Sequence, residues 1–186
     1  MTILTTARLR LEPFDERHFD GIRAINSDPA VMRYITGRPE TTEETHAVIA
    51  RTSASWAALG YSWWVWIEQP GGAIIGSGCV QNIERDLANP LEVGWRLLPE
   101  KQGQGYATEA AREMARFAFE TLNAPILYAV CDPANTTSAK VMQRLGMHHR
   151  GIERWYARDT CAYSISRQAW LKQTTNPSTP DLGSHQ

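Results

Sequence analysis

Two glycines, Gly103 and Gly105, separate a predicted strand from a predicted long helix. Glycine has no Cβ, so the backbone at such a turn approaches a ligand closely. The first N–H groups of the following helix have no partner within the helix and lie at the positive end of its dipole. This combination suits an anion, and a pyrophosphate is the natural guest. The segment from Leu97 to Ala110 is therefore the first candidate for ligand binding.

Two familiar phosphate-binding patterns do not fit this turn. A P-loop requires a Lys after its last glycine, and Tyr106 follows Gly105. A dinucleotide-binding fingerprint requires a third glycine where this chain has Thr108, and it belongs to the first strand–helix–strand unit. The pattern Gln102-x-x-Gly105-x-Ala107 remains, and an ordinary turn without a ligand is its plain alternative.

That pattern resembles the Q/R-x-x-G-x-G/A motif for acetyl-CoA in the GCN5-related N-acetyltransferase (GNAT) superfamily. Two further segments agree in order and spacing: Glu92 to Leu97 looks like the family's fourth strand, and Asn135 to Met147 looks like its N-x-x-S…LG[FM] helix. The motifs Arg8-Leu9-Arg10-Leu11 and Tyr163…Trp170 are similar to the RimJ/RimL type of ribosomal-protein N-terminal acetyltransferase. The resemblance covers about residues 3–172.

The resemblance implies an acetyl-CoA-dependent N-acetyltransferase, in which a primary amine of a small molecule or of a peptide or protein N-terminus attacks the thioester directly. It implies a bulge at Gly94 that opens a cleft for pantetheine. It also implies the residues that hold the cofactor: Trp95, Arg96 and Leu97 for pantetheine; Gln102, Gly103, Gln104, Gly105, Tyr106, Ala107 and Thr108 for the pyrophosphate; Asn135 and Ser138 for the far side; and Arg144 for the adenosine phosphate.

Glu92 is the base that the resemblance suggests for removing a proton from the amine. A carboxylate of ordinary pKa is a weak base, so this role requires burial or a relayed water. The alternative for Glu92 is a structural ion pair with Arg96 or Arg85.

The acid that protonates the leaving thiolate is less well defined. The family often has a Tyr four residues before the helix-ending glycine, and this chain has Met142 there. Ser138 is the nearest hydroxyl and serves either as the acid or as a cofactor contact only. Tyr106 and Tyr156 are the other candidates.

The acceptor site is expected in segments other than those for the cofactor: the link between the first two helices, the Trp-rich strand and the last hairpin. The candidate residues are Arg33, Tyr34, Trp64, Trp66 and Trp155. Side chains alternate along a strand, so Trp64 and Trp66 share one face and Trp63 takes the other. One face packs into the core and the other lines the pocket. A protein N-terminus, an amino acid, a polyamine, an antibiotic and an amino sugar all stay open as acceptors.

Composition excludes several classes of protein. The chain has 186 residues and a formal charge of −1, which argues against nucleic acid as a partner. No apolar run approaches the roughly 18 to 20 residues of a membrane span, and the N-terminus lacks the apolar region of a signal peptide. We therefore expect a cytoplasmic protein without a membrane partner. Three separated cysteines and five histidines without ligand spacing predict no disulfide framework and no metal site. A homodimer stays open.

The pattern of apolar residues predicts strands over 8–13, 61–68, 73–83, 91–98, 126–131, 148–156 and 160–168, and helices over 15–26, 41–59, 107–122 and 138–145. The order β-α-α-β-β-β-α-β-α-β-β is an α/β (α+β) arrangement. The resemblance makes it the GNAT fold, with a mixed, mostly antiparallel sheet of six to seven strands flanked by about four helices. We expect one domain over residues 1–172 and a disordered polar tail over 173–186.

Two other classes of function stay open at this stage. A non-catalytic acetyl-CoA or CoA sensor needs the glycines and Asn135 but neither a base nor an acceptor channel. A nucleotide hydrolase or an oxidoreductase binds ATP or NAD in place of CoA. Thiol release with an amine panel tests the first class, and thermal stabilisation by nucleotides tests the second.

Overall fold

The computed structural model describes residues 1–175. Eight strands form one sheet: β1 (Leu4–Thr5), β2 (Leu9–Pro13), β3 (Trp63–Glu68), β4 (Ile74–Asn82), β5 (Leu91–Leu97), β6 (Ile126–Cys131), β7 (His148–Trp155) and β8 (Arg158–Ser166). Their order across the sheet is β1-β2-β3-β4-β5-β6-β8-β7. All neighbours run antiparallel except β5 and β6, which are parallel. This is the mixed, mostly antiparallel sheet that the family resemblance implied, with eight strands in place of the six to seven expected.

The strands are connected by α1 (Phe19–Asn26), α2 (Pro29–Met32), α3 (Thr42–Leu59), α4 (Tyr106–Glu120) and α5 (Thr136–Arg144), and α6 (Arg167–Thr175) follows β8. Short 3-10 helices occur at η1 (Glu16–His18), η2 (Ile83–Arg85) and η3 (Pro99–Lys101). Thr41 and Glu44 form the predicted capping box at the start of α3, and Gly60 ends that helix in the left-handed conformation. None of the helices within the described range is long and apolar enough to cross a membrane.

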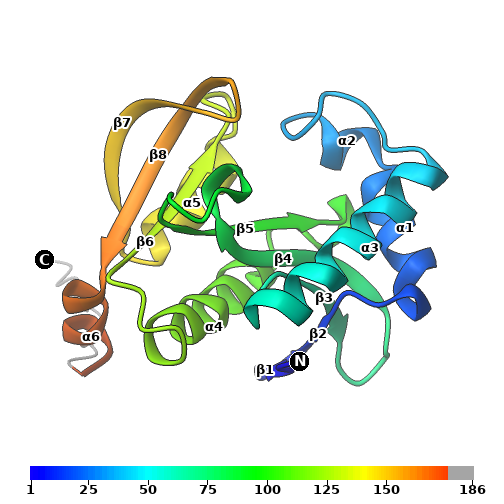
Figure 1. Cartoon of the computed structure of the whole chain (residues 1–186), viewed down its shortest axis with the longest axis horizontal. Coiled ribbons are helices and arrows are strands. Elements are labelled where there is room, and N and C mark those ends of the chain that lie inside the picture. Colours follow the sequence, from blue (N-terminus) through cyan, green and yellow to red (C-terminus); the bar gives the residue numbers. More distant parts are fainter. Residues whose placement is uncertain (176–186) are drawn as a thin grey trace, which may run out of the picture.

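Helices cover both faces of the sheet (Figure 1). Because side chains alternate along β3, Val65 packs with Phe14, Ile22 of α1 and Ile49 of α3. Its neighbours Trp64 and Trp66 pack instead into the larger cluster that contains α4. Two hydrophobic layers therefore hold the middle of the sheet rigidly in place.

The sheet opens where β5 and β6 separate. These strands pair only at Leu91 with Leu127 and at Glu92 with Tyr128, and beyond that point they diverge (Figure 1). One edge of β5 from residue 93 to residue 97 therefore has no strand partner among the described residues. The predicted bulge at Gly94 is wrong, because β4 and β5 keep continuous register along all of β5. The cleft arises from the early end of the β5–β6 pairing.

Three elements were not predicted from the sequence. β1 has two residues and α2 has one turn, both too short for a periodic pattern. The last predicted strand, 160–168, ends at Ser166, and α6 begins at Arg167. α6 continues to Thr175, so residues 173–175 of the predicted tail are helical. The rest of that tail, 176–186, lies outside the described residues.

A substitution at Gly76 tests how tightly β4 is packed between its neighbours. A Cβ there would lie 2.7 Å from the carbonyl oxygen of Arg96 and 2.9 Å from the ring of Trp66. Because β5 is held in register, we expect Gly76→Ala to lower the free energy of unfolding by about 1–3 kcal/mol. Urea denaturation measures it, with Gly71→Ala as the control, since a Cβ at Gly71 meets nothing within 4 Å. Equal stabilities of the two variants would contradict this packing.

Candidate active site

Two adjoining cavities occupy the space where β5 and β6 diverge. The larger, about 570 Å³, is named here the Glu92 cavity, and the smaller, about 370 Å³, the Gly105 cavity. The residues that border both cavities are Tyr34, Ile35, Trp95, Arg96, Asn135 and Ser138. The two cavities therefore form one continuous cleft across the end of the parallel pair.

The glycine turn lines the Gly105 cavity as the sequence predicted. Gly103 has φ +73° and Gly105 has φ +85°, a left-handed backbone that glycine adopts without strain. Gly105 is the N-cap residue of α4, and no side chain among residues 1–173 caps that helix. The N–H groups of the first turn of α4 are thus left for an anion, as the pyrophosphate of a CoA molecule requires.

A partly buried contact that the sequence did not reveal holds this turn in place. The Glu109 carboxylate accepts hydrogen bonds from the Thr6 hydroxyl at 2.6 Å and from Arg8 Nε at 2.7 Å. Arg8 also donates to the carbonyl oxygen of Gln104 at 3.0 Å and lies 4.2 Å from the centre of the Tyr106 ring. The loop between β1 and β2 thereby fixes the start of α4.

Not all of the predicted pyrophosphate residues face the cleft. Ala107, Thr108, Gln102 and both glycines border the Gly105 cavity, whereas Gln104 and Tyr106 do not. The Tyr106 hydroxyl donates to Glu68, which also pairs with Lys101 at 2.6 Å. Tyr106 is therefore wrong as a candidate acid, because its hydroxyl is bonded to Glu68 outside the cleft.

The start of α5 forms the opposite wall of the cleft. The Asn135 side chain caps this helix by accepting the Ser138 N–H at 3.1 Å. Ser138 borders both cavities and so lies at their junction. Arg144 borders the Gly105 cavity one helix length away, and Met142 borders the Glu92 cavity.

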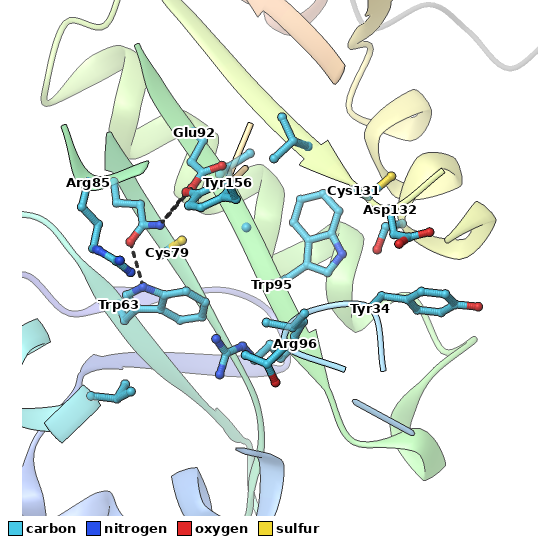
Figure 2. A pocket seen from close by; sticks show the side chains of 18 of the residues that line it. Tyr34, Trp63, Cys79, Arg85, Glu92, Trp95, Arg96, Cys131, Asp132 and Tyr156 are labelled. Atoms are coloured by element: carbon cyan, nitrogen blue, oxygen red, sulfur yellow. Dashed lines mark hydrogen bonds between the residues drawn. The ribbon is translucent and has the colours of Figure 1, made fainter. Parts of the chain in front are cut away.

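Glu92 is buried, with 6% of its surface exposed, and it is the centre of a hydrogen-bonded chain. Gln81 Nε2 donates to Glu92 Oε1 at 2.9 Å, and the Tyr156 hydroxyl donates to the same oxygen (Figure 2). Trp63 Nε1 donates to Gln81 Oε1 at 3.0 Å. Because indole is a donor only, it orients the Gln81 amide so that its NH2 group faces Glu92.

Burial controls the electrostatics of this chain. It raises the pKa of Glu92, against the opposing effect of the hydrogen bonds from Gln81 and Tyr156. Burial and the neighbouring Glu92 charge raise the pKa of Tyr156, so this phenol stays a hydrogen-bond donor. A carboxyl group with a raised pKa is a stronger base than an ordinary one, which is what removal of a proton from an amine requires.

The predicted alternative for Glu92, an ion pair with Arg96 or Arg85, is not formed by the described residues. Arg96 Nη1 instead donates to Asn26 Oδ1 at 2.7 Å and lies 3.7 Å from Glu40 Oε1. Its guanidinium also lies 4.8 Å from the centre of a Trp63 ring. Arg96 therefore links the sheet to α1 and to the segment before α3.

Strained backbone brings Tyr156 into the cleft. Tyr156 and Ala157 both have positive φ, +54° and +57°, in the tight turn between β7 and β8. The Tyr156 N–H donates to Glu84 Oε1 at 2.7 Å, and Glu84 and Arg85 are themselves left-handed, with φ +58° and +60°. Each such residue costs about 1–2 kcal/mol. Strain of this kind accumulates at functional sites when neighbouring contacts hold it in place.

Among the predicted acceptor residues, only Tyr34 borders the cleft. Trp64 and Trp66 have no exposed surface, because their face of β3 packs against α4, and Trp63 on the other face lines the Glu92 cavity. Trp155 donates to Glu153 at 2.9 Å and does not border either cavity. Arg33 is exposed and lies over the Tyr34 ring, away from both cavities. Arg33, Trp64, Trp66 and Trp155 therefore do not line the cleft, contrary to the prediction.

Across the described residues, no group of three or more His, Cys, Asp or Glu is arranged to hold a metal ion.

Comparison with known proteins agrees with this geometry. Residues 8–148 match the acetyltransferase (GNAT) domain family. The chain is 31% identical to the FsC-acetyl coenzyme A-N(2)-transacetylase of Aspergillus fumigatus, over 91% of this chain and 78% of that protein. It is 26% identical to the uncharacterized N-acetyltransferase YnaD of Bacillus subtilis, over 90% of this chain and 98% of that protein. An acetyltransferase crystal structure from Agrobacterium tumefaciens superposes with a TM-score of 0.76 at 27% identity, over 89% of this chain and 94% of that one.

Glu92 gives a prediction about stability that does not depend on activity. Burial raises its pKa above the ordinary value of 4.5, so ionising it destabilises the folded state. This cost is absent below pH 4.5 and grows as the pH rises through the raised pKa. We expect Glu92→Gln, which does not titrate, to gain unfolding free energy relative to the native protein over that interval. Urea denaturation at pH 4 to 8 measures the difference, and parallel curves would contradict the raised pKa.

Proposed function

Because this chain belongs to the GNAT family of N-acetyltransferases, we propose that its cleft transfers the acetyl group of acetyl-CoA to a primary amine of a small molecule or of a peptide N-terminus. The observation that carries the proposal is that buried Glu92 lies in the same continuous cleft as the glycine turn. A basic group is thus present at one end and an anion site at the other. A cleft that only retained CoA would not require the buried carboxyl group.

The cofactor residues follow from the order of features along the cleft. The pyrophosphate belongs at the N-terminus of α4, where uncapped N–H groups and two glycines meet. The free edge of β5 beside Trp95, Arg96 and Leu97 offers backbone groups to the pantetheine amides. Arg144 of α5 is left for the adenosine phosphate, with Lys140 bordering the same cavity.

The residues of the Glu92 cavity supply the proton transfers. Acetyl-CoA provides an activated acetyl group, whose carbonyl carbon forms a bond to the amine nitrogen while the carbon–sulfur bond breaks. Glu92 accepts the proton that the amine loses, directly or through one water. Backbone N–H groups on the free edge of β5 stabilise the charge that develops on the carbonyl oxygen.

Ser138 is the group we assign to the leaving sulfur. Ser138 lies at the junction of the two cavities, where the thioester has to lie if the pyrophosphate is at α4 and the amine faces Glu92. Tyr156 is instead bound to Glu92, which it orients. Met142 borders the Glu92 cavity at the position where the family resemblance implies a Tyr, and its thioether has no proton to donate.

The acceptor class is narrowed by the relatives only in part. The Aspergillus fumigatus relative is named for transfer to an N(2) nitrogen, which supports an amine acceptor here. A protein named for ribosomal-protein-S5-alanine acetylation, from Vibrio fischeri, shares the fold with a TM-score of 0.76 at 19% identity. Likeness at that identity supports the fold alone, so the RimJ/RimL subgroup stays a prediction that peptide acceptors test.

Activity against an amine panel tests the proposed function directly. We expect release of free thiol from acetyl-CoA with at least one amine, at a rate that rises with pH as Glu92 loses its proton. Glu92→Gln should remove that rise and lower kcat about 10²-fold or more. Arg116→Gln, on the exposed surface of α4, is the control and should leave the profile unchanged. Absence of thiol release with every amine and N-terminal peptide would overturn the proposal.

Gly105→Glu tests the pyrophosphate position. The new carboxylate would stand at the N-terminus of α4, so we expect the Kd for CoA in calorimetry to rise at least 10-fold. Gly105→Ala is a control for backbone strain, because it places a side chain at the same φ of +85° but adds no negative charge. Gly71→Glu adds the same charge in an open turn away from both cavities and should leave the Kd unchanged. An undiminished affinity of Gly105→Glu would refute the assignment.

A further inference from the structure

The charges around the Glu92 cavity do not cancel. Its border carries four carboxyl groups and five guanidinium groups: Glu40, Glu44, Glu92 and Asp132, with Arg38, Arg51, Arg85, Arg96 and Arg158. Arg38 pairs with Glu44 at 2.5 Å, and Arg96 pairs with Glu40. Within the described part of the chain, the side chains of Arg51, Arg85 and Arg158 have no ion pair or hydrogen bond. The cavity border therefore has more guanidinium groups than carboxyl groups, and three of the guanidinium groups are unpaired within the described residues.

Arg51 and Arg85 reach the cavity from different elements. Arg51 lies on the side of α3 that also presents Ala47 and Val48 to the cavity, one turn apart. Arg85 ends η2 in the left-handed conformation, and Figure 2 shows it on the same side as Glu92 and Trp63, away from Tyr34 and Asp132. The charge of Arg85 adds to burial in lowering the pKa of Arg51, so the two guanidinium groups repel each other. An anion between them removes that repulsion.

Two cavity carboxylates act on the pair without an ion pair to it: the charge of Glu40 opposes the lowering of the Arg51 pKa, and the charge of Arg85 lowers the pKa of Glu92. Two further carboxylates, Glu84 and Asp86, are engaged elsewhere. Glu84 accepts the Tyr156 N–H, and Asp86 Oδ1 accepts the Ala88 N–H at 2.9 Å. Neither residue borders the cavity. The cofactor's phosphates do not explain the pair either, because Arg51 and Arg85 are absent from the Gly105 cavity. The anion that fits here must come with the acceptor.

We propose that the acceptor amine carries a carboxylate, which Arg51 and Arg85 bind while the amine faces Glu92. Guanidinium groups present planar pairs of N–H donors that match the two oxygens of a carboxylate. The inference rests on the proposed function and deepens it: the substrate class is an amino acid or another amine with a carboxylate within reach. Arg158, at the start of β8 beside the Tyr156 turn, adds positive charge at the rim.

Equilibrium binding tests this class without requiring turnover. Calorimetry on the full chain saturated with CoA would compare the ω-amino acids from glycine to 6-aminohexanoate with their amides and with alkylamines of equal length. Common L-amino acids and their amides form the second series. We expect at least one acid to bind about 10-fold or more tightly than its amide. Binding of no acid better than its amide would overturn the proposal.

Variants assign the preference to the two arginines. We expect Arg51→Gln and Arg85→Gln each to weaken binding of the preferred acid by 10-fold or more and to leave binding of its amide unchanged. Arg116→Gln is the matched control. Loss of acid and amide binding together would mean a collapsed cavity, and unfolding curves together with the Kd for CoA identify that case. Arg51→Lys then tests the assignment, because lysine keeps the positive charge but lacks the planar pair of N–H donors. We expect this variant still to bind the acid more tightly than the amide. Equal binding of the two would overturn the assignment.

O-Phosphoethanolamine distinguishes the kind of anion. If it binds more tightly than every carboxylate, the acceptor carries a phosphate and the proposed carboxylate is wrong. Thiol release supplies the independent check on activity. Acid-selective binding without any turnover would refute the proposed function and leave only the carboxylate-binding role of the two arginines standing. Turnover of neutral amines that is indifferent to both arginine variants would support the proposed function and overturn the carboxylate inference.

Discussion

The early end of one strand pairing determines most of what this molecule can bind. β5 and β6 share two residue pairs and then separate, although both belong to one sheet. Backbone groups of β5 that would otherwise be satisfied by β6 are left facing a cleft, and a buried polar backbone requires a partner. The turn after β5, the start of α5 and the hairpin of β7 and β8 all border the space that results. A longer parallel pairing would close both cavities.

A hydrogen-bonded chain across the sheet holds the reactive end of this cleft. Trp63 of β3, Gln81 of β4, Glu92 of β5 and Tyr156 of the β7–β8 turn are linked in sequence by donors and acceptors of fixed direction. Gln81 and Glu92 are opposite each other in the register, so the backbone pairing places their side chains together. Burial makes the carboxyl group more basic, and the two donors keep it in a single orientation.

Features that depend on residues close together in the sequence could be predicted, and contacts between distant residues could not. The glycine turn, the capping box at Thr41 and the helix starting near Ser138 depend on residues close together in sequence, and all three are found. Glu92 was identified and Tyr156 was named as a possible acid, but the bonds of Glu92 to Gln81 and to Tyr156 were not predicted, since these partners are 11 and 64 residues away. The face of β3 that meets the cleft is decided by which helix covers it. The alternation of side chains along β3 showed that Trp63 and Trp64 lie on opposite faces of the strand. Only the position of α4 shows that the Trp64 face is the buried one.

The cleft is assembled from two sets of segments, with β5 and α5 bordering both cavities. The cofactor side comes from β5, α4 and α5, whereas Arg51, Arg85 and Tyr156 come from α3, η2 and a hairpin turn. Changes in one set therefore leave the backbone of the other in place. In evolutionary terms, the acceptor can be exchanged along a lineage while the acetyl donor is retained, and the same separation lets an engineer alter residues 51 and 85 without rebuilding the turn at Gly105.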